Sequence, residues 1–324
     1  CKFTKNVIEF TSKDKSIACI WVKNHGDITI TFNHFLRVQN TIDDSHQFKG
    51  SIYFTENHVT STDGEVIFNY NTIEETSNKQ FSTFSIYKVY PFNIDHNIIK
   101  NCNINGYLCN LDLNGHVQYD KEFTFTNLSL IGCKSRSQTG GGLGIWLIFG
   151  GKEGKLSFND CRFESNFAEK VNADSGGCGG GFECGGASTH KTELVFDNCD
   201  FITNRADKFG GALAILSTRQ ATITNCRFDR NEAEEGGGAI YVYPKATDNL
   251  RLPKCTISKC NFNSNIDKTN INGHAVLFRE ISGAATEFII EDNCQFIDNG
   301  DLQDNKFKGY TIVSAAPTFQ FKDS

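Results

Sequence analysis

The chain has 324 residues, a formal net charge of −6 and charges of both signs interspersed along it. It contains 28 phenylalanines, 29 glycines and 13 cysteines but no methionine. No run of Lys and Arg stands out, which argues against nucleic acid or an anionic membrane as the partner. No apolar stretch approaches the ~20 residues that a membrane-spanning helix needs, so we expect membrane attachment only through segments outside this sequence.

A six-residue motif, Cys-x-Phe-x-x-Asn, organises the chain. Its six copies begin at Cys1, Cys161, Cys199, Cys226, Cys260 and Cys294. Weaker units lie between the first two copies: one at residues 29–35, and three in which we align Asn71, Cys102 and Cys133 with the motif Cys. Self-similarity at this period is typical of stacked repeats. We therefore predict one repeat array over residues 1–324, with degenerate coils in 1–133 and regular coils in 134–324.

Each unit contains three strand-like pieces. The first alternates apolar residues and ends on the Cys, as in residues 155–161, and the second is the motif itself, where Cys and Phe share a face. The third opens on glycine and turns apolar, as in residues 210–216 and 237–243. Three strands in about 30 residues favour an all-β fold, a right-handed parallel β-helix (solenoid) of about ten coils. A β-sandwich would not repeat residue for residue at this period.

Parallel pairing between coils places equivalent residues ~4.8 Å apart, so we expect ladders of like side chains. Stacked Phe side chains point inward, Asn occupies a turn where it tolerates the left-handed conformation, and Gly-Gly forms the next corner. The predicted ladders are Cys161, Cys199, Cys226, Cys260 and Cys294; Phe163, Phe201, Phe228, Phe262 and Phe296; and Asn166, Asn204, Asn231, Asn265 and Asn299. Cys102 and Cys133 are expected to continue the Cys ladder.

Disulfides are better placed off the ladder than along it. The Cβ atoms of ladder neighbours are ~4.8 Å apart, which is longer than the Cβ–Cβ distance of a relaxed disulfide. Cys178 and Cys184, within one glycine-rich insertion, are the candidate pair; Cys255 with Cys260 and Cys102 with Cys109 stay open as alternatives. The segment Asn127-Leu-Ser129 is the one acceptable N-glycosylation sequon.

Gly-Gly-Ala-Ile/Leu together with Phe-x-x-Asn, repeated at this spacing, resembles the repeats of polymorphic outer-membrane proteins. These are bacterial autotransporter adhesins with β-helical passenger domains, and related repeats occur in surface proteins of parasitic protists. The resemblance is good over residues 161–299 and weaker before them. Nothing corresponds to the family's C-terminal barrel. The resemblance implies the fold and a role as an extracellular or cell-surface adhesin, without implying a binding site.

Three classes of function remain open. The first is a non-enzymatic rod that presents loops, such as 171–190 and 243–254, to a protein or glycan ligand. The second is an intracellular or fibre-associated rod that works by self-association, which the scarcity of sequons favours. The third is a carbohydrate-active β-helix enzyme, for which Asn71-Thr-Ile73, Asp43-Asp44 and Asn272-Gly-His274 are only partial motifs.

The sequence offers no cluster of Cys and His at metal-ligand spacing, so we predict neither a metal nor a cofactor. The eight His are scattered. Residue 1 lies inside a motif and residues 318–324 resemble the run before a motif Cys. We therefore expect this chain to be a segment of a longer rod.

Overall fold

The computed structural model describes most of the chain. The described residues are 2–4, 7–12, 20–23, 28–40, 50–55, 66–75, 77–78, 82–87, 92–104, 109–112, 122–136, 144–148, 154–172, 176–184, 192–216, 218–243, 254–279, 287–303, 306–308, 311–314 and 318–322. They form strands, with no helix among them.

Three long sheets run the length of the molecule. Sheet 1 has eleven strands: β1 (Lys2–Thr4), β4 (Ile28–Thr31), β7 (Val66–Asn69), β11 (Phe92–Asp95), β15 (Glu122–Thr126), β19 (Gly154–Asn159), β23 (Thr192–Asp197), β27 (Gln220–Thr224), β31 (Lys254–Ser258), β35 (Glu287–Glu291) and β40 (Thr318–Lys322). Sheet 3 has ten: β3 (Ile20–Lys23), β6 (Gly50–Thr55), β10 (Ser82–Tyr87), β14 (Cys109–Asp112), β18 (Gly144–Ile148), β22 (Phe182–Cys184), β26 (Leu213–Leu216), β30 (Ile240–Tyr243), β34 (Val276–Phe278) and β39 (Ile312–Ser314).

Sheet 2 lies between them in the chain and is divided into two rows. Row 2a contains β2 (Val7–Ser12), β5 (His34–Asn40), β8 (Thr72–Glu74), β12 (Ile98–Lys100), β16 (Ser129–Ile131), β20 (Arg162–Glu164), β24 (Asp200–Ile202), β28 (Arg227–Asp229), β32 (Asn261–Asn263) and β36 (Gln295–Ile297). Row 2b contains β9 (Ser77–Asn78), β13 (Asn103–Ile104), β17 (Lys134–Arg136), β21 (Phe167–Glu169), β25 (Arg205–Ala206), β29 (Glu232–Ala233) and β33 (Ile266–Asp267), and β5 pairs into both rows. A hairpin, β37 (Asp301–Gln303) with β38 (Lys306–Lys308), is antiparallel.

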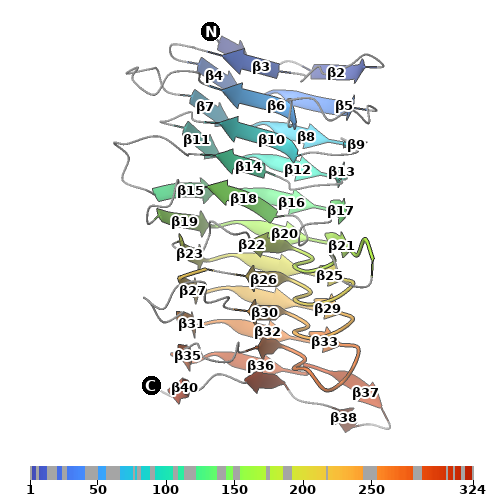
Figure 1. The fold of residues 1–324 in the computed structure, drawn as a ribbon, viewed down its shortest axis with the longest axis vertical. Coiled ribbons are helices and arrows are strands. Elements are labelled where there is room, and N and C mark those ends of the chain that lie inside the picture. Colours follow the sequence, from blue (N-terminus) through green and yellow to red (C-terminus); the bar gives the residue numbers. More distant parts are fainter. Residues whose placement is uncertain are drawn as a thin grey trace.

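The coils stack along the long axis, with the first and last described strands at opposite ends (Figure 1). Every strand in the three sheets pairs in parallel with its counterpart in the next coil, for example Phe201 with Phe228 and Phe228 with Phe262. This confirms the predicted parallel β-helix. The predicted second piece is two strands rather than one, because a corner at the motif Asn separates row 2a from row 2b.

The register confirms the weaker unit at residues 29–35 and the place of Asn71, and it corrects two alignments. Ile98 pairs with Thr72 and Ser129, so Asn97 and Leu128 are the residues at the position of the motif Cys. Cys102 and Cys133 lie one corner later, at the position of the motif Asn. The alignment was wrong because both corners hold Asn or Cys and are followed by a similar short strand.

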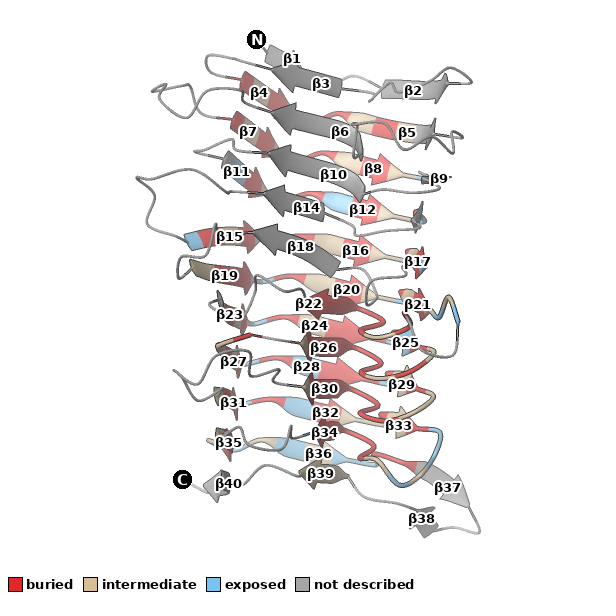
Figure 2. Cartoon of the chain, in the orientation of Figure 1, coloured by how far each residue is buried: buried red, intermediate tan, exposed pale blue. Residues whose placement is uncertain are grey.

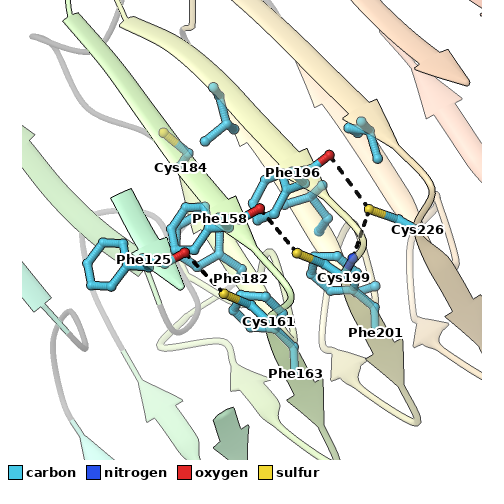
Figure 3. Packing of buried hydrophobic residues seen from close by; sticks show 14 of the residues in the cluster. Phe125, Phe158, Cys161, Phe163, Phe182, Cys184, Phe196, Cys199, Phe201 and Cys226 are labelled. Carbon is cyan, nitrogen blue, oxygen red and sulfur yellow. Dashed lines mark hydrogen bonds between the residues drawn. The ribbon is translucent and has the colours of Figure 1, made fainter. Parts of the chain in front are cut away.

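The interior is filled by apolar side chains from all three sheets. Figure 2 shows buried residues in strands of each sheet, for example in β23, β24 and β26. In row 2a the rings of the five predicted Phe residues stack almost parallel, with centroid separations of 4.6, 4.8, 4.7 and 4.7 Å from Phe163 to Phe296. A second stack in sheet 1 joins Phe125, Phe158 and Phe196. Figure 3 shows how the two stacks face each other across the core, where Phe158 meets Phe163 edge-on. The first four members of the predicted ladder are fully buried, whereas Phe296 is partly exposed.

The corners depend on left-handed backbone, but not at the residue expected. The residue before the motif Asn has positive φ, for example Ser165 at 53° and Thr203 at 51°. Because the preceding residue makes the turn, the side chain of the Asn points into the interior. At the corner into sheet 3, Gly210 has φ +67°, and the next residue, Gly211, could not carry a Cβ because that atom would lie 2.2 Å from the carbonyl oxygen of Gly238. The two glycines of this corner therefore serve different purposes.

Candidate functional site

The motif Asn residues form a continuous ladder at the corner between rows 2a and 2b. The Oδ1 of Asn231 accepts hydrogen bonds from the backbone N and the Nδ2 of Asn204, both at 3.0 Å. The Nδ2 of Asn231 donates to the carbonyl of Phe201 and to Oδ1 of Asn265. The same pattern runs from Asn166 to Asn299, so it satisfies buried backbone groups in every coil it spans. This confirms the predicted asparagine ladder.

The motif Cys residues occupy the preceding corner and make a sulfur version of the same contacts. The Sγ of Cys226 accepts from the backbone N of Cys199 at 3.4 Å and donates to the carbonyl of Phe196 at 3.7 Å (Figure 3). In the earlier coils Asn33, Asn71 and Asn97 take this position and form an amide ladder. Burial and the neighbouring thiols raise the pKa of Cys226, so this side chain has structural rather than nucleophilic character.

The predicted disulfide between Cys178 and Cys184 is wrong, because both are free thiols. Cys184 lies in the interior core, whereas Cys178 packs in a second apolar cluster with Ala214, Tyr241 and Leu277. Cys255 and Cys260, which form one of the alternative pairs, are also free thiols.

Asn127, the candidate glycosylation site, lies at a corner with φ +52° and continues a column of outward side chains. Its Nδ2 is 3.1 Å from Nε2 of His96, which stacks on Tyr70, and Tyr70 stacks on Phe32. Phe32 and Tyr70 are about half exposed and have φ +57°, which is unusual for bulky residues.

The partial enzyme motifs do not come together. Asn71 is a buried corner residue, Asn272 and His274 support a loop many coils away, and Asp43-Asp44 lies outside the described residues. Acids and arginines do meet on the outer surface of row 2a. There Arg227 binds Asp200 at 2.9 Å and Arg230 binds Asp229 at 2.9 Å. These carboxylates are thus held in ion pairs between or within coils.

A cavity of about 510 Å³ lies on the outer surface of sheet 3, and we call it the outer cleft. It is lined by Phe209, Glu235, Thr269, Asn272, Leu277, Phe278, Arg279 and Val313. These residues come from β34, from Arg279 directly after it, from β39 and from the loops that lead from row 2b into sheet 3. Of the two predicted recognition loops, the structure describes residues 171–172 and 176–184 of the first, but only Tyr243 and Lys254, the end residues, of the second. None of these described residues lines the cleft.

The floor of the outer cleft is an apolar layer outside the main core. Ala214, Tyr241, Leu277 and Val313 are register partners in successive coils and face outward. The loops fold over them, so that Tyr241 is only 4% exposed, and Phe209 stacks on its ring at 4.5 Å. Burial raises the pKa of Tyr241 to about 12, although the neighbouring Arg279 favours the phenolate.

Two opposite charges line the cleft. The exposed Arg279 has its Cζ 5.9 Å from the centre of the Phe209 ring. Within the described part of the chain, neither Arg279 nor the half-buried Glu235 has an ion-pair partner. The backbone carbonyl of Glu235 accepts from Nδ2 of Asn272, which fixes one wall of the cleft.

The loop bearing Thr269 and Asn272 is fixed by a fully buried carboxylate, Asp267. Its oxygens accept from the backbone N and Oγ1 of Thr269 and from the backbone N of Asn272, at 2.7–3.0 Å. The backbone N of Asp267 in turn donates to Nδ1 of His274, at 3.1 Å. The edge of the cleft is therefore preorganised.

The sequence analysis missed Asp267 and named His274 only within a partial enzyme motif, although the repeat contained a signal. Asp267 takes the position that Ala168, Ala206 and Ala233 hold in the preceding coils. His274 takes the position of the second corner glycine, Gly211 or Gly238. Departures from the repeat thus mark the site more clearly than the repeat does.

The described residues contain no group of three or more His, Cys, Asp or Glu side chains placed to hold a metal ion. They also form no helix long and apolar enough to cross a membrane.

Comparison of the whole chain with protein-family models, with curated proteins and with solved structures finds no match.

Proposed function

We propose that the protein is a non-enzymatic β-helical rod that recognises a protein or glycan ligand through the outer cleft. The observation that carries the proposal is a pair of opposite charges, Arg279 and Glu235, beside an apolar floor; the described residues provide neither of them with an ion-pair partner. Ligand sites are typically concave and apolar with a few fixed polar groups, and this cleft has that composition. Rigid stacked coils and the Asp267 loop support it, which reduces the ordering entropy that binding must overcome.

We propose the cell surface as the place of action, supported by the resemblance of residues 161–299 to β-helical adhesin repeats. An intracellular rod is the second candidate, and one observation favours it. The five motif cysteines from Cys161 to Cys294 are free thiols, as is usual in a reducing compartment. The flanking sequence distinguishes the two, since a signal peptide with an anchor supports the surface and their absence supports the internal rod.

The test of the recognition role is a binding screen of the purified chain against arrays of glycans and peptides. Arg279→Ala should weaken binding of a captured ligand at least tenfold, about 1.4 kcal/mol, because it removes the guanidinium that contacts the ligand. Arg230→Ala, which removes an exposed arginine from the outer surface of row 2a, is the matched control and should leave binding unchanged. Equal effects of the two variants, or a complete lack of ligands, would contradict the proposal.

A further inference from the structure

We propose that the outer cleft binds an acidic saccharide. Arg279 would pair with the carboxylate of the saccharide, and Thr269, Asn272 and Glu235 would accept hydrogen bonds from its hydroxyls. This inference rests on the proposed recognition function and names the class of ligand.

The first argument is that Arg279 is used differently from other arginines of the same region. Arg162, Arg205, Arg227 and Arg230 each bind a carboxylate of this chain. Arg279 instead lies over Phe209 and beside Tyr241, and among the described residues no carboxylate is its partner. A guanidinium held by a ring keeps its planar set of N–H donors for a ligand, and carboxylates match that geometry with two parallel hydrogen bonds.

The second argument is that several residues lining the cleft offer hydrogen-bond acceptors to a ligand. The hydroxyl of Thr269 donates to Asp267, so it can only accept from a ligand. The Nδ2 of Asn272 donates to the carbonyl of Glu235 and, at 3.5 Å, to Oγ1 of Thr269. With both N–H groups used, the amide oxygen of Asn272 is the group that a ligand can contact. Together with the carboxylate of Glu235, these groups form an acceptor wall. A ligand that fits has hydroxyl donors at one end and an anion at the other.

The third argument is size and the apolar floor. The volume of about 510 Å³ lies within the ~300–1,000 Å³ range of compact small-ligand pockets, whereas an extended peptide needs a longer groove. Phe209, Leu277 and Val313 give the floor an apolar surface for the C–H groups of a sugar ring. A ring that is apolar on its faces and polar on its edges satisfies both surfaces.

The test compares two ligands that differ only at one carbon. Methyl β-glucuronide carries a carboxylate where methyl β-glucoside carries a hydroxymethyl group. We expect the wild-type chain to bind the glucuronide at least fivefold more tightly, as measured by ligand-observed NMR titration. Arg279→Gln should remove this preference while retaining weak glucoside binding, and Arg230→Gln should leave it intact.

Glu235→Gln tests the role of the acceptor wall. It keeps an acceptor for hydroxyls but removes a negative charge, so the affinity for the glucuronide should stay the same or rise. Nα-acetyl-lysine amide serves as a cationic probe. The inference is overturned if that probe binds more tightly than the glucuronide and loses affinity in Glu235→Gln, or if both sugars bind equally. Binding of neutral sugars alone would overturn the acidic class and leave the recognition function standing, whereas a lack of any ligand in the array screen would remove both. Thermal melting monitored by circular dichroism checks that each variant is folded.

Discussion

At the scale of single residues, this protein uses thiol and amide side chains for one task. Cys226 and Asn71 occupy the same corner in different coils, and each side chain accepts a hydrogen bond from a backbone N and donates one to a backbone carbonyl of the preceding coil. The sequence motif indicated inward Cys and Phe correctly. It could not show that Cys178 and Cys184 lie on opposite sides of the wall of sheet 3, because sequence proximity says nothing about the face on which each side chain ends.

Buried thiols should make the protein sensitive to alkali. Burial raises the pKa of Cys184 and of Cys255 to about 12, above the ordinary value of a thiol near 9. Their contribution to stability is therefore complete below pH ~9 and is lost as the pH rises towards 12, by about 1.4 kcal/mol per pH unit for each thiol. Urea unfolding at pH 8, 9.5 and 10.5 should show that Cys255→Ala has a shallower pH dependence than the wild type between the two higher values. An unchanged slope would contradict the assignment.

At the scale of elements, the corners carry most of the structural information. The two-residue signature of a left-handed residue followed by Asn or Cys occurs twice per coil, which is why Cys102 and Cys133 were placed one corner too early. The strands were predictable because apolar residues alternate, as in residues 155–161. The split of sheet 2 into rows 2a and 2b was not, since a single residue at φ +53°, Ser165, turns the chain without interrupting the apolar pattern.

The asparagine ladder gives a prediction at this scale. Asn231→Ala should lower the free energy of unfolding by about 2–4 kcal/mol, because it leaves the backbone N of Asn204 and the carbonyl of Phe201 without partners. Asn231→Cys should lower it by less than Asn231→Ala, since a thiol makes both contacts at the neighbouring corner. Chemical denaturation measures the difference, with exposed Asn261→Ala as the control. Equal losses for Ala and Cys at position 231 would show that the thiol cannot replace the amide.

At the scale of the whole molecule, the rod is a stack in which each coil packs on its neighbours. Stability in such a solenoid is approximately a sum of coil and interface contributions. Damage to one coil should therefore stay local. The outer cleft belongs to the same scale, because it is built from β34, β39 and loops of several coils.

Phe228→Ala tests this locality. The ring is fully buried between Phe201 and Phe262, so its removal should destabilise by about 3–5 kcal/mol. Amide hydrogen exchange should show the largest loss of protection in β24, β28 and β32 and little change near β8. Asn261→Ala, an exposed change on β32, should leave protection unchanged. A uniform loss over all coils would instead indicate one cooperative unit.

The sequence by itself determined the parallel coil, its repeat, the inward Phe stack and the asparagine ladder, because identical residues at a fixed period must meet when strands pair in parallel. Only the tertiary structure decided where departures from the repeat create a cleft. Asp267 and His274 replace the Ala and Gly of the repeat, and the loop that they fix lines the outer cleft together with Arg279 and Glu235. The physical reason is that a repeat specifies contacts between equivalent residues, whereas the cleft consists of contacts between non-equivalent ones.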